Sequence, residues 1–281
     1  MRINTNVSSL TAQEAATNTN FNIKNSLEKL STGLKINKAS DDASGLAIAD
    51  KLRTQVTSIN QGVANGNSAI ALLQIADKSM AEQSKILDTV KSKLIQANTD
   101  TTSADGREAI RKDVTKLLTQ LDNIATQTNY NGTALLQASR TGTGTLTSLS
   151  FQVGEKSGDT ISTSAIQANT VGYSLGTLKG LAANALTKTA AATGQTSVDT
   201  AITRLNGYRG DIGSTQNQVE SAVRNLMTQS TNIKAAESVI RDVDYAEESA
   251  NFNKLNIISQ AGSYAISQSN ATQQNVLRLL Q

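Results

Sequence analysis

The stretch that decides the fold is residues 52–94, LRTQVTSINQGVANGNSAIALLQIADKSMAEQSKILDTVKSKL. Every seventh position is apolar or glycine: Leu52, Ile59, Gly66, Leu73, Met80, Leu87 and Leu94. The positions four residues after the first three are Val56, Val63 and Ile70, and the later ones are Asp77, Ser84 and Lys91. A repeat of 3.5 residues is typical of a helix packed along another helix. The pattern predicts one helix over residues 42–98, whose apolar stripe narrows in its second half.

Two more segments carry a helical seam. Residues 105–128 alternate spacings of four and three at Ile110, Val114, Leu117, Leu121 and Ile124. We expect Asn129 to Gly132 to end this helix, with Gly132 as a left-handed stop. Residues 197–240 repeat every seven at Val198, Leu205, Ile212, Val219, Leu226, Ile233 and Ile240. Three such stripes bury one another in a bundle. The predicted fold is mainly α, a long coiled-coil helical bundle formed by the N- and C-terminal segments with a small β-hairpin region in the middle.

The composition narrows the function. The chain has no Pro, so long helices can run without a break, and no His or Cys, which removes the commonest general base, metal ligand and thiol nucleophile. The net charge is +3, and the acidic and basic residues are interspersed along the chain. No run of basic residues indicates nucleic-acid binding. No run of apolar residues is long enough for a membrane span, and the N-terminus lacks a signal-peptide core. We expect no enzyme, cofactor, metal, nucleic acid or membrane insertion, and export without a cleaved signal peptide.

The middle of the chain, residues 139–196, is rich in Ser, Thr and Gly. Leu146 to Val153 and Thr160 to Ser162 flank a Gly-containing turn, which predicts a β-hairpin. A second short strand is expected at Tyr173 to Leu178. Residues 182–196 are expected to be a surface loop or a weak helix.

Two acidic clusters have competing interpretations. Asp41 and Asp42 precede the first long helix, and four carboxylates lie between Asp242 and Glu248. Paired carboxylates can serve catalysis or bind a metal, but the spacing of a calcium loop is not met. Carboxylates at helix starts accept free amide protons and face the positive end of the helix dipole. We therefore favour helix capping at both places.

The two ends carry amphipathic helical patterns with no core to join. Ordering a residue costs about 1–2 kcal/mol, whereas a buried large apolar side chain returns about 1.5–3 kcal/mol. Each end has too few such residues to fold alone, so we expect both ends to be disordered in the monomer and helical only when many copies pack together. The predicted self-assembly residues are Val7, Leu10, Phe21, Leu27, Leu30, Leu34, Phe252, Leu255, Ile258, Ala265, Val276, Leu277 and Leu280.

The chain resembles the bacterial flagellins over roughly residues 1–178 and 197–281. The resemblance is carried by KLSTGLKINKASDDASGLAIA at 29–49, RDVDYAEE at 241–248, ISQAG at 258–262 and QNVLRLL at 274–280. Gln273 stands where the family usually has Pro.

The resemblance implies a structural subunit that polymerises into the flagellar filament for motility, or alternatively a hook–filament junction protein. Residues 1–41 and 242–281 would form an inner coiled coil lining the filament channel. Residues 42–241 would form a helical rod, with 139–196 as its β-hairpin and variable surface segment, and without outer domains. The implied partners are copies of itself, a filament cap protein, a hook–filament junction protein, an export chaperone and the type III flagellar export apparatus. The implied location is extracellular.

One motif departs from the family. Many flagellins carry Arg-Val-Arg-Glu-Leu-Ala where the innate-immune flagellin receptor docks. This chain has Thr89, Val90, Lys91, Ser92, Lys93 and Leu94 there. Thr cannot replace a bidentate Arg. The chain therefore resembles the group that evades the receptor, and weak or absent activation is expected.

Overall fold

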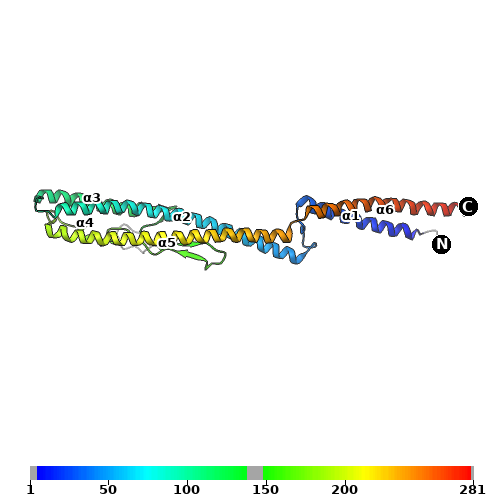
Figure 1. The fold of residues 1–281 in the computed structure, drawn as a ribbon, viewed down its shortest axis with the longest axis horizontal. Helices are drawn as coiled ribbons and strands as arrows, with labels where there is room; N and C mark the ends of the chain where they lie inside the picture. Colours follow the sequence, from blue (N-terminus) through cyan, green and yellow to red (C-terminus); the bar gives the residue numbers. More distant parts are fainter. Residues whose placement is uncertain (1–4, 138–147, 280–281) are drawn as a thin grey trace. The chain divides into compact units, whose positions relative to one another are not determined.

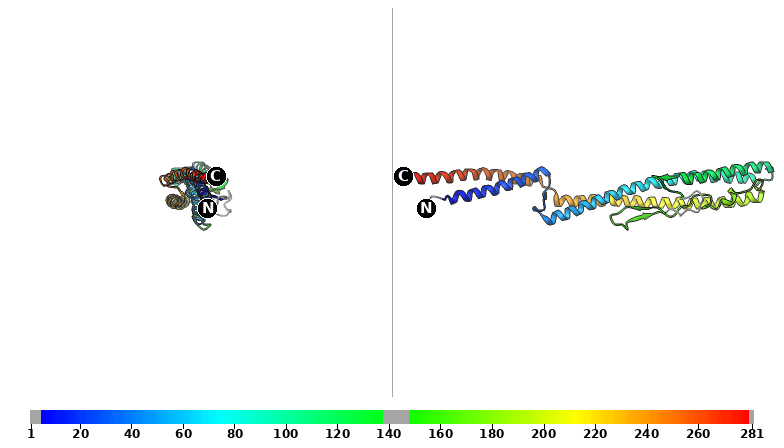
Figure 2. Two further views of the ribbon diagram at one scale, coloured as in Figure 1. Left: turned by 90° about the vertical axis from the view of Figure 1, so that its right-hand side faces the viewer. Right: turned by 180° about the vertical axis from the view of Figure 1, so that it is seen from behind.

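The structure is a computed structural model that describes residues 5–137 and 148–279. It divides into two compact units, one of Met1–Val56 with Thr231–Gln281 and one of Thr57–Ser230. Long helices dominate both (Figures 1 and 2). The elements in chain order are α1 (Val7–Thr32), α2 (Ala43–Ala97), α3 (Ala104–Gln127), β1 (Asn129–Tyr130), β2 (Thr133–Ala134), β3 (Ser150–Gln152), β4 (Thr160–Ser162), α4 (Gly176–Lys179), α5 (Lys188–Arg241) and α6 (Tyr245–Leu279). The mainly α fold class is confirmed.

In the first unit, α1 and α6 lie side by side and run antiparallel (Figure 1). Both helices break at one joint, where Leu34 and Asp242 form a β-bridge. The Lys35 amide donates to the Arg241 carbonyl at 2.6 Å, and the Val243 amide donates to the Gly33 carbonyl at 3.0 Å. Gly33 adopts a φ of +74°, and a Cβ there would lie 2.9 Å from the Tyr245 hydroxyl. The joint therefore needs glycine on both conformational and steric grounds.

In the second unit, α2, α3 and α5 pack around a core that we call the rod core. The heptad residues predicted for α2 are buried in this unit from Ile59 to Leu94. The expected narrowing of the stripe is wrong, because the companion line moves by one position. Ala69, Ala76, Gln83, Val90 and Ala97 are also seven apart and buried. The first half of α2 packs with α5 and the β3–β4 hairpin. The second half packs against α3 as well as α5, so a wider stripe of its surface is buried.

Two of the three polar companion positions of α2, Asp77 and Lys91, form ion pairs with α5. Asp77 accepts from Arg209 at 2.8 Å, and Lys91 donates to Asp199 at 2.5 Å. They lie at the edge of the seam, where long side chains reach water.

The predicted hairpin is confirmed, with β3 and β4 antiparallel and Phe151 opposite Ile161. Leu146, which was expected to begin it, lies outside the described residues. The hairpin packs on a face of α2 that carries glycine at positions 62 and 66. A Cβ on Gly62 would lie 2.5 Å from the Val153 carbonyl oxygen, and one on Gly66 would lie 2.4 Å from a methyl of Val223 on α5. Glycine lets the hairpin and α5 approach α2 closely.

Three local predictions are wrong. Asn131 (φ +51°) and Gly132 (φ +81°) do not stop α3 but form the two-residue turn of the β1–β2 hairpin, which Asn-Gly favours. α3 ends earlier, where the Thr128 amide still donates to the Ile124 carbonyl. Tyr173 to Leu178 is not a strand but a tight turn followed by α4. The long helix expected from residue 197 begins earlier: α5 starts at Lys188, inside the segment expected to be a surface loop or a weak helix, because Ala191 and Gly194 continue its buried seam at spacings of three and four.

The capping interpretation is confirmed at both acidic clusters. Asp42 accepts from the amides of Ser44 and Gly45 at 3.0 and 2.9 Å. Asp244 accepts from those of Ala246 and Glu247 at 2.9 and 3.2 Å. These carboxylates therefore start α2 and α6.

Candidate self-assembly surface

The seam between α1 and α6, which together we call the terminal pair, is built from small and polar side chains. Ser26 is only 2% exposed and donates to Glu248 at 2.5 Å. Gly262 lies opposite Ala16, with 3.9 Å between the position of an added Cβ and the Ala16 Cβ. At the far end, Asn6 donates to the Ser269 carbonyl at 3.3 Å. The pair is held by hydrogen bonds and small contacts, together with half-buried large apolar side chains such as Ile23, Leu30 and Ile266.

Small seam residues let the two backbones come close. Cα atoms of α1 and α6 approach within 8 Å along the pair. Among the described residues, Cα atoms of α2 seldom come this close to those of α3 or α5. In the rod, large side chains hold the helix axes apart. A close seam of small residues buries little apolar area, so it contributes little hydrophobic stabilisation.

Several large apolar residues of the terminal pair are exposed to water. Val7, Leu10, Phe21 and Leu27 on α1 are 63, 55, 63 and 53% exposed, and Ile258 on α6 is 42% exposed. Of the other predicted self-assembly residues, Ala265 is exposed, whereas Leu30, Leu34, Phe252 and Leu255 are half-buried. Val276 and Leu277 lie in α6 but their side chains are not described, and Leu280 lies outside the described residues.

The sequence reasoning missed two exposed residues of α6. Ile257 is 67% exposed and Tyr264 is 73% exposed, both more than Ile258. They are seven residues apart, so they share one helix face. Their heptad spacing was a usable signal. The prediction instead followed the line through Phe252, Leu255 and Ile258, which is more apolar.

The positions that match the receptor motif do not form a uniform surface. Thr89 and Ser92 are exposed, whereas Val90 and Leu94 are fully buried in the rod core. Lys93 pairs with Asp113 on α3 at 3.3 Å, and Lys91 pairs with Asp199 as described above. Two of the positions are therefore open to a partner, two carry intramolecular ion pairs, and two support the fold.

Other chemistry is sparse in the part of the chain that the structure describes. No group of three or more Asp and Glu residues is arranged to hold a metal ion within residues 5–137 and 148–279. Within the same ranges, no helix combines the length and apolarity needed to cross a bilayer.

Comparison with known proteins gives consistent matches. The family described as bacterial flagellin N-terminal helical region matches residues 3–141, and bacterial flagellin C-terminal helical region matches residues 195–280. The flagellar filament 33 kDa core protein of Treponema phagedenis is 34% identical over 291 residues, covering 100% of both chains. The flagellin of Bacillus subtilis strain 168 is 34% identical over 303 residues, again covering 100% of both.

A putative flagellar hook-associated protein from Vibrio parahaemolyticus is similar in structure. It gives a TM-score of 0.57 at 12% identity and covers 72% of this chain and 99% of that one. At this identity the likeness concerns the fold alone.

Proposed function

The chain belongs to the bacterial flagellin family and is a structural subunit of the flagellar filament, outside the cell; on this premise, we propose that copies polymerise through the outward apolar residues of the terminal pair. The observation that carries the proposal is the exposure of large apolar side chains on both helices of the terminal pair, while small residues lie in the seam between them. The exposed residues are Val7 and Phe21 on α1 and Ile257 and Tyr264 on α6. Exposed apolar residues on two adjacent helices mark an interaction surface. A repeated contact between unlike faces of identical subunits generates an open helical polymer when the rotation between subunits does not close a ring.

We further propose that residues 1–41 and 242–281 form an inner coiled coil that lines the filament channel, with 42–241 as the rod. In this scheme the terminal pair is disordered in the free monomer, because its seam buries too little apolar surface to offset the ordering entropy. Amide exchange on free monomer tests the scheme. Residues 7–32 should exchange nearly as fast as an unfolded chain, and strong protection there would contradict it.

The assembly surface can be tested with matched exposed residues. The Val7→Ser and Phe21→Ser double variant removes two outward side chains from α1. The control is Val171→Ser with Met227→Ser, two rod residues of similar exposure, 54 and 56%. Filament growth from purified monomer after seeding is followed by light scattering and electron microscopy.

We expect the α1 double variant to raise the monomer concentration needed for growth at least tenfold, because each lost apolar contact recurs at every subunit. The rod control should assemble like the natural protein. Normal filaments from the α1 variant would refute the proposed surface.

We also propose that the chain activates the innate flagellin receptor weakly. Support comes from Thr89 and Ser92, the exposed positions where the common motif has Arg and Glu. Replacing all six residues would include Leu94→Ala in the rod core, which costs about 2–5 kcal/mol. The sharper test is therefore Thr89→Arg with Ser92→Glu, which should raise signalling in a receptor reporter cell, with Thr54→Arg and Ser58→Glu on the same helix as control. A full response from the unaltered protein would overturn the proposal.

The remaining partners follow from the same premise. We propose that the chain passes through the flagellar export apparatus unfolded. An export chaperone would hold its C-terminal segment, and the chain would fold beneath a filament cap protein, above a hook–filament junction protein. We assign it no catalytic role. No observation favours the alternative that the chain is itself a junction protein.

A further inference from the structure

Residues 166–180, which we call the clasp, cover the rod core from outside the three long helices. The clasp is a turn and α4 rather than a long element, yet it is deeply buried. Five of its apolar side chains are fully or nearly fully covered, namely Ile166, Ala168, Tyr173, Leu175 and Leu178, whereas Val171 is 54% exposed. They belong to the same core cluster as the seam residues of α2, α3 and α5. The clasp therefore closes the core of this unit.

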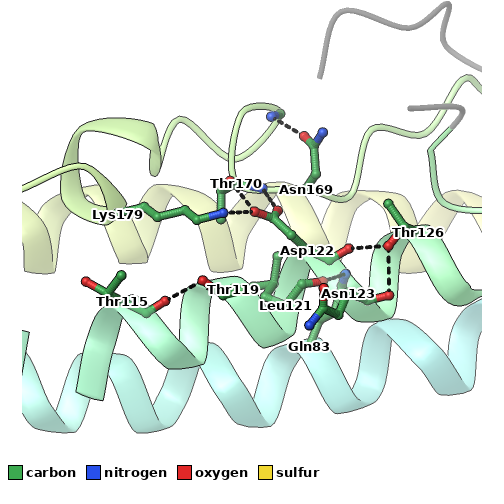
Figure 3. A network of polar contacts seen from close by, with 11 residues as sticks. Gln83, Thr115, Thr119, Leu121, Asp122, Asn123, Thr126, Asn169, Thr170 and Lys179 are labelled. Carbon is green, nitrogen blue, oxygen red and sulfur yellow. Dashed lines mark hydrogen bonds and ion pairs between the residues drawn. The ribbon is translucent and has the colours of Figure 1, made fainter. Parts of the chain in front are cut away.

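A buried carboxylate on α3 binds the clasp (Figure 3). Asp122 is 5% exposed and accepts three hydrogen bonds. The Thr170 amide and hydroxyl donate at 2.8 and 2.9 Å, and the Lys179 ammonium donates at 2.6 Å. One side chain thus holds both the turn and the end of α4. No other segment supplies a donor to Asp122 among the described contacts.

The other two helices hold the clasp at neighbouring points. Gln83 on α2 is fully buried, donates to the Ala168 carbonyl at 2.8 Å and accepts from the Tyr173 hydroxyl at 3.1 Å. Burial raises the pKa of Tyr173, which keeps the hydroxyl protonated as that donor. Arg204 on α5 donates to the Gly172 carbonyl at 2.6 Å. The clasp is tied to each of the three long helices by a polar contact.

Asp122 and Thr170 are buried, whereas the Lys179 side chain is 33% exposed. Loss of the carboxylate therefore leaves the buried donors of Thr170 without an acceptor, which is costly. The long helices, however, keep their own heptad contacts when the clasp leaves. Leu87, Val114 and Leu205 lie on the helices themselves and are all buried. Local opening needs only the clasp contacts to break, and proteins open in such contiguous units.

We propose that the clasp is a separate cooperative unit of the rod, locked by Asp122, and that it opens without unfolding of the helices when this carboxylate is lost. Asn at position 122 would put an N–H group where Thr170 and Lys179 donate, so the closed state loses acceptors without losing volume. The Asp122 contacts therefore set the equilibrium between the closed clasp and an open state in which the rod core is exposed to solvent.

The absence of Cys from the chain permits a direct measurement. Ala168→Cys places a thiol in the clasp at a position that is fully buried, and Ala69→Cys places one under the β3–β4 hairpin at a position 2% exposed. Each is combined with Asp122→Asn, and the rate of reaction with a soluble thiol reagent is measured on the full chain. Lys188→Met, which removes the exposed ion pair with Asp100, serves as the charge control.

Asp122→Asn should increase labelling of the Ala168→Cys variant at least tenfold and change labelling of the Ala69→Cys variant less than twofold. Lys179→Met should act in the same direction as Asp122→Asn, and Lys188→Met should change neither rate. Equal acceleration at both sites would mean global unfolding, and unchanged labelling at position 168 would mean that Asp122 does not lock the clasp. Either result overturns the proposal.

Hydrogen exchange on the cysteine-free protein gives an independent measurement. Asp122→Asn should lower protection of residues 166–180 at least tenfold while residues 204–226 of α5 keep theirs. Loss of protection in α5 to the same extent would also overturn the proposal.

Discussion

The rod and the terminal pair are both made of long helices with apolar stripes, yet they place their large side chains on opposite sides. In the rod, Leu73, Leu87 and Leu205 lie between the helices and are at most 1% exposed. In the terminal pair, small residues such as Ser26 and Gly262 lie between the helices, and Phe21 and Tyr264 are in water. A helix whose large residues face its own partner is stable within one chain. In the proposed scheme, the outward apolar residues of the terminal pair are covered by further copies of the chain, so the buried stripe of the rod serves folding and the exposed residues serve assembly.

The largest contrast is expected from large-to-small substitutions. Leu87→Ala should lower the free energy of unfolding by about 2–5 kcal/mol, because it leaves a cavity at a fully buried position. Phe21→Ala should change it by less than about 0.5 kcal/mol, because the ring is exposed. Urea unfolding of the monomer, followed by circular dichroism, measures both. A similar loss for the two variants would erase the distinction between rod and terminal pair.

Glycine-to-alanine substitutions should change stability by less than Leu87→Ala does, and with opposite signs in the rod and in the terminal pair. Gly66→Ala forces a Cβ to 2.4 Å from a methyl of the buried and stiff Val223, which should cost about 1–3 kcal/mol in urea unfolding. Gly262→Ala meets only Ala16 at 3.9 Å and should stabilise α6 by up to about 1 kcal/mol through helix propensity. Thermal disassembly of filaments reads out the second variant. Filaments of Gly262→Ala that dissociate at a lower temperature would show a tighter seam than the structure has.

The smallest effect concerns acid stability of the rod at the start of α3. The Arg111 guanidinium, aided by the Asn184 amide, lowers the pKa of Glu108 to about 2. A carboxyl with a lowered folded pKa contributes stability above its unfolded pKa of about 4.3, and this contribution is lost as pH falls toward about 2. Glu108→Gln should therefore lower the urea midpoint at pH 7, with a difference that shrinks from about pH 5 downward.

The control for the pH experiment is Glu155→Gln, at an exposed position in the β3–β4 turn. It should leave the midpoint unchanged at every pH. A deficit of Glu108→Gln that persists undiminished at pH 2 would show that its cause is packing rather than charge.

Much of the fold could be predicted from periodicity, because a heptad repeat both defines a helix and points its stripe. The bounds of α2 and α3, the β3–β4 hairpin and the two acidic caps followed from local rules. The failures were residues whose local pattern competes with tertiary contacts. Tyr173 and Leu175 alternate like a strand, but no neighbouring strand exists for them among the described residues, and the rod core draws them into a turn. Asn131 and Gly132 suit a helix stop and a hairpin turn equally well.

The candidate surface was predicted only in part. The sequence identified Val7, Leu10 and Phe21, but it could not show which face of each terminal helix its partner covers. That depends on the small residues of the other helix, which are far away in the chain. The structure adds Ile257 and Tyr264, which are exposed, whereas Gly262 and Ser259 of the same helix lie toward α1.

The sequence by itself determined that this chain forms long helices and that it lacks His and Cys. Its resemblance to the flagellins rested on the quoted motifs at 29–49, 241–248, 258–262 and 274–280. Spacing, composition and motifs are all local properties. Only the tertiary structure decided that small residues such as Ser26 and Gly262 lie in the terminal seam. It also decided that the companion line of α2 shifts by one position and that Asp122 ties residues 166–180 to α3. These depend on pairs of residues tens to hundreds of positions apart, and no local pattern specifies which side chains meet.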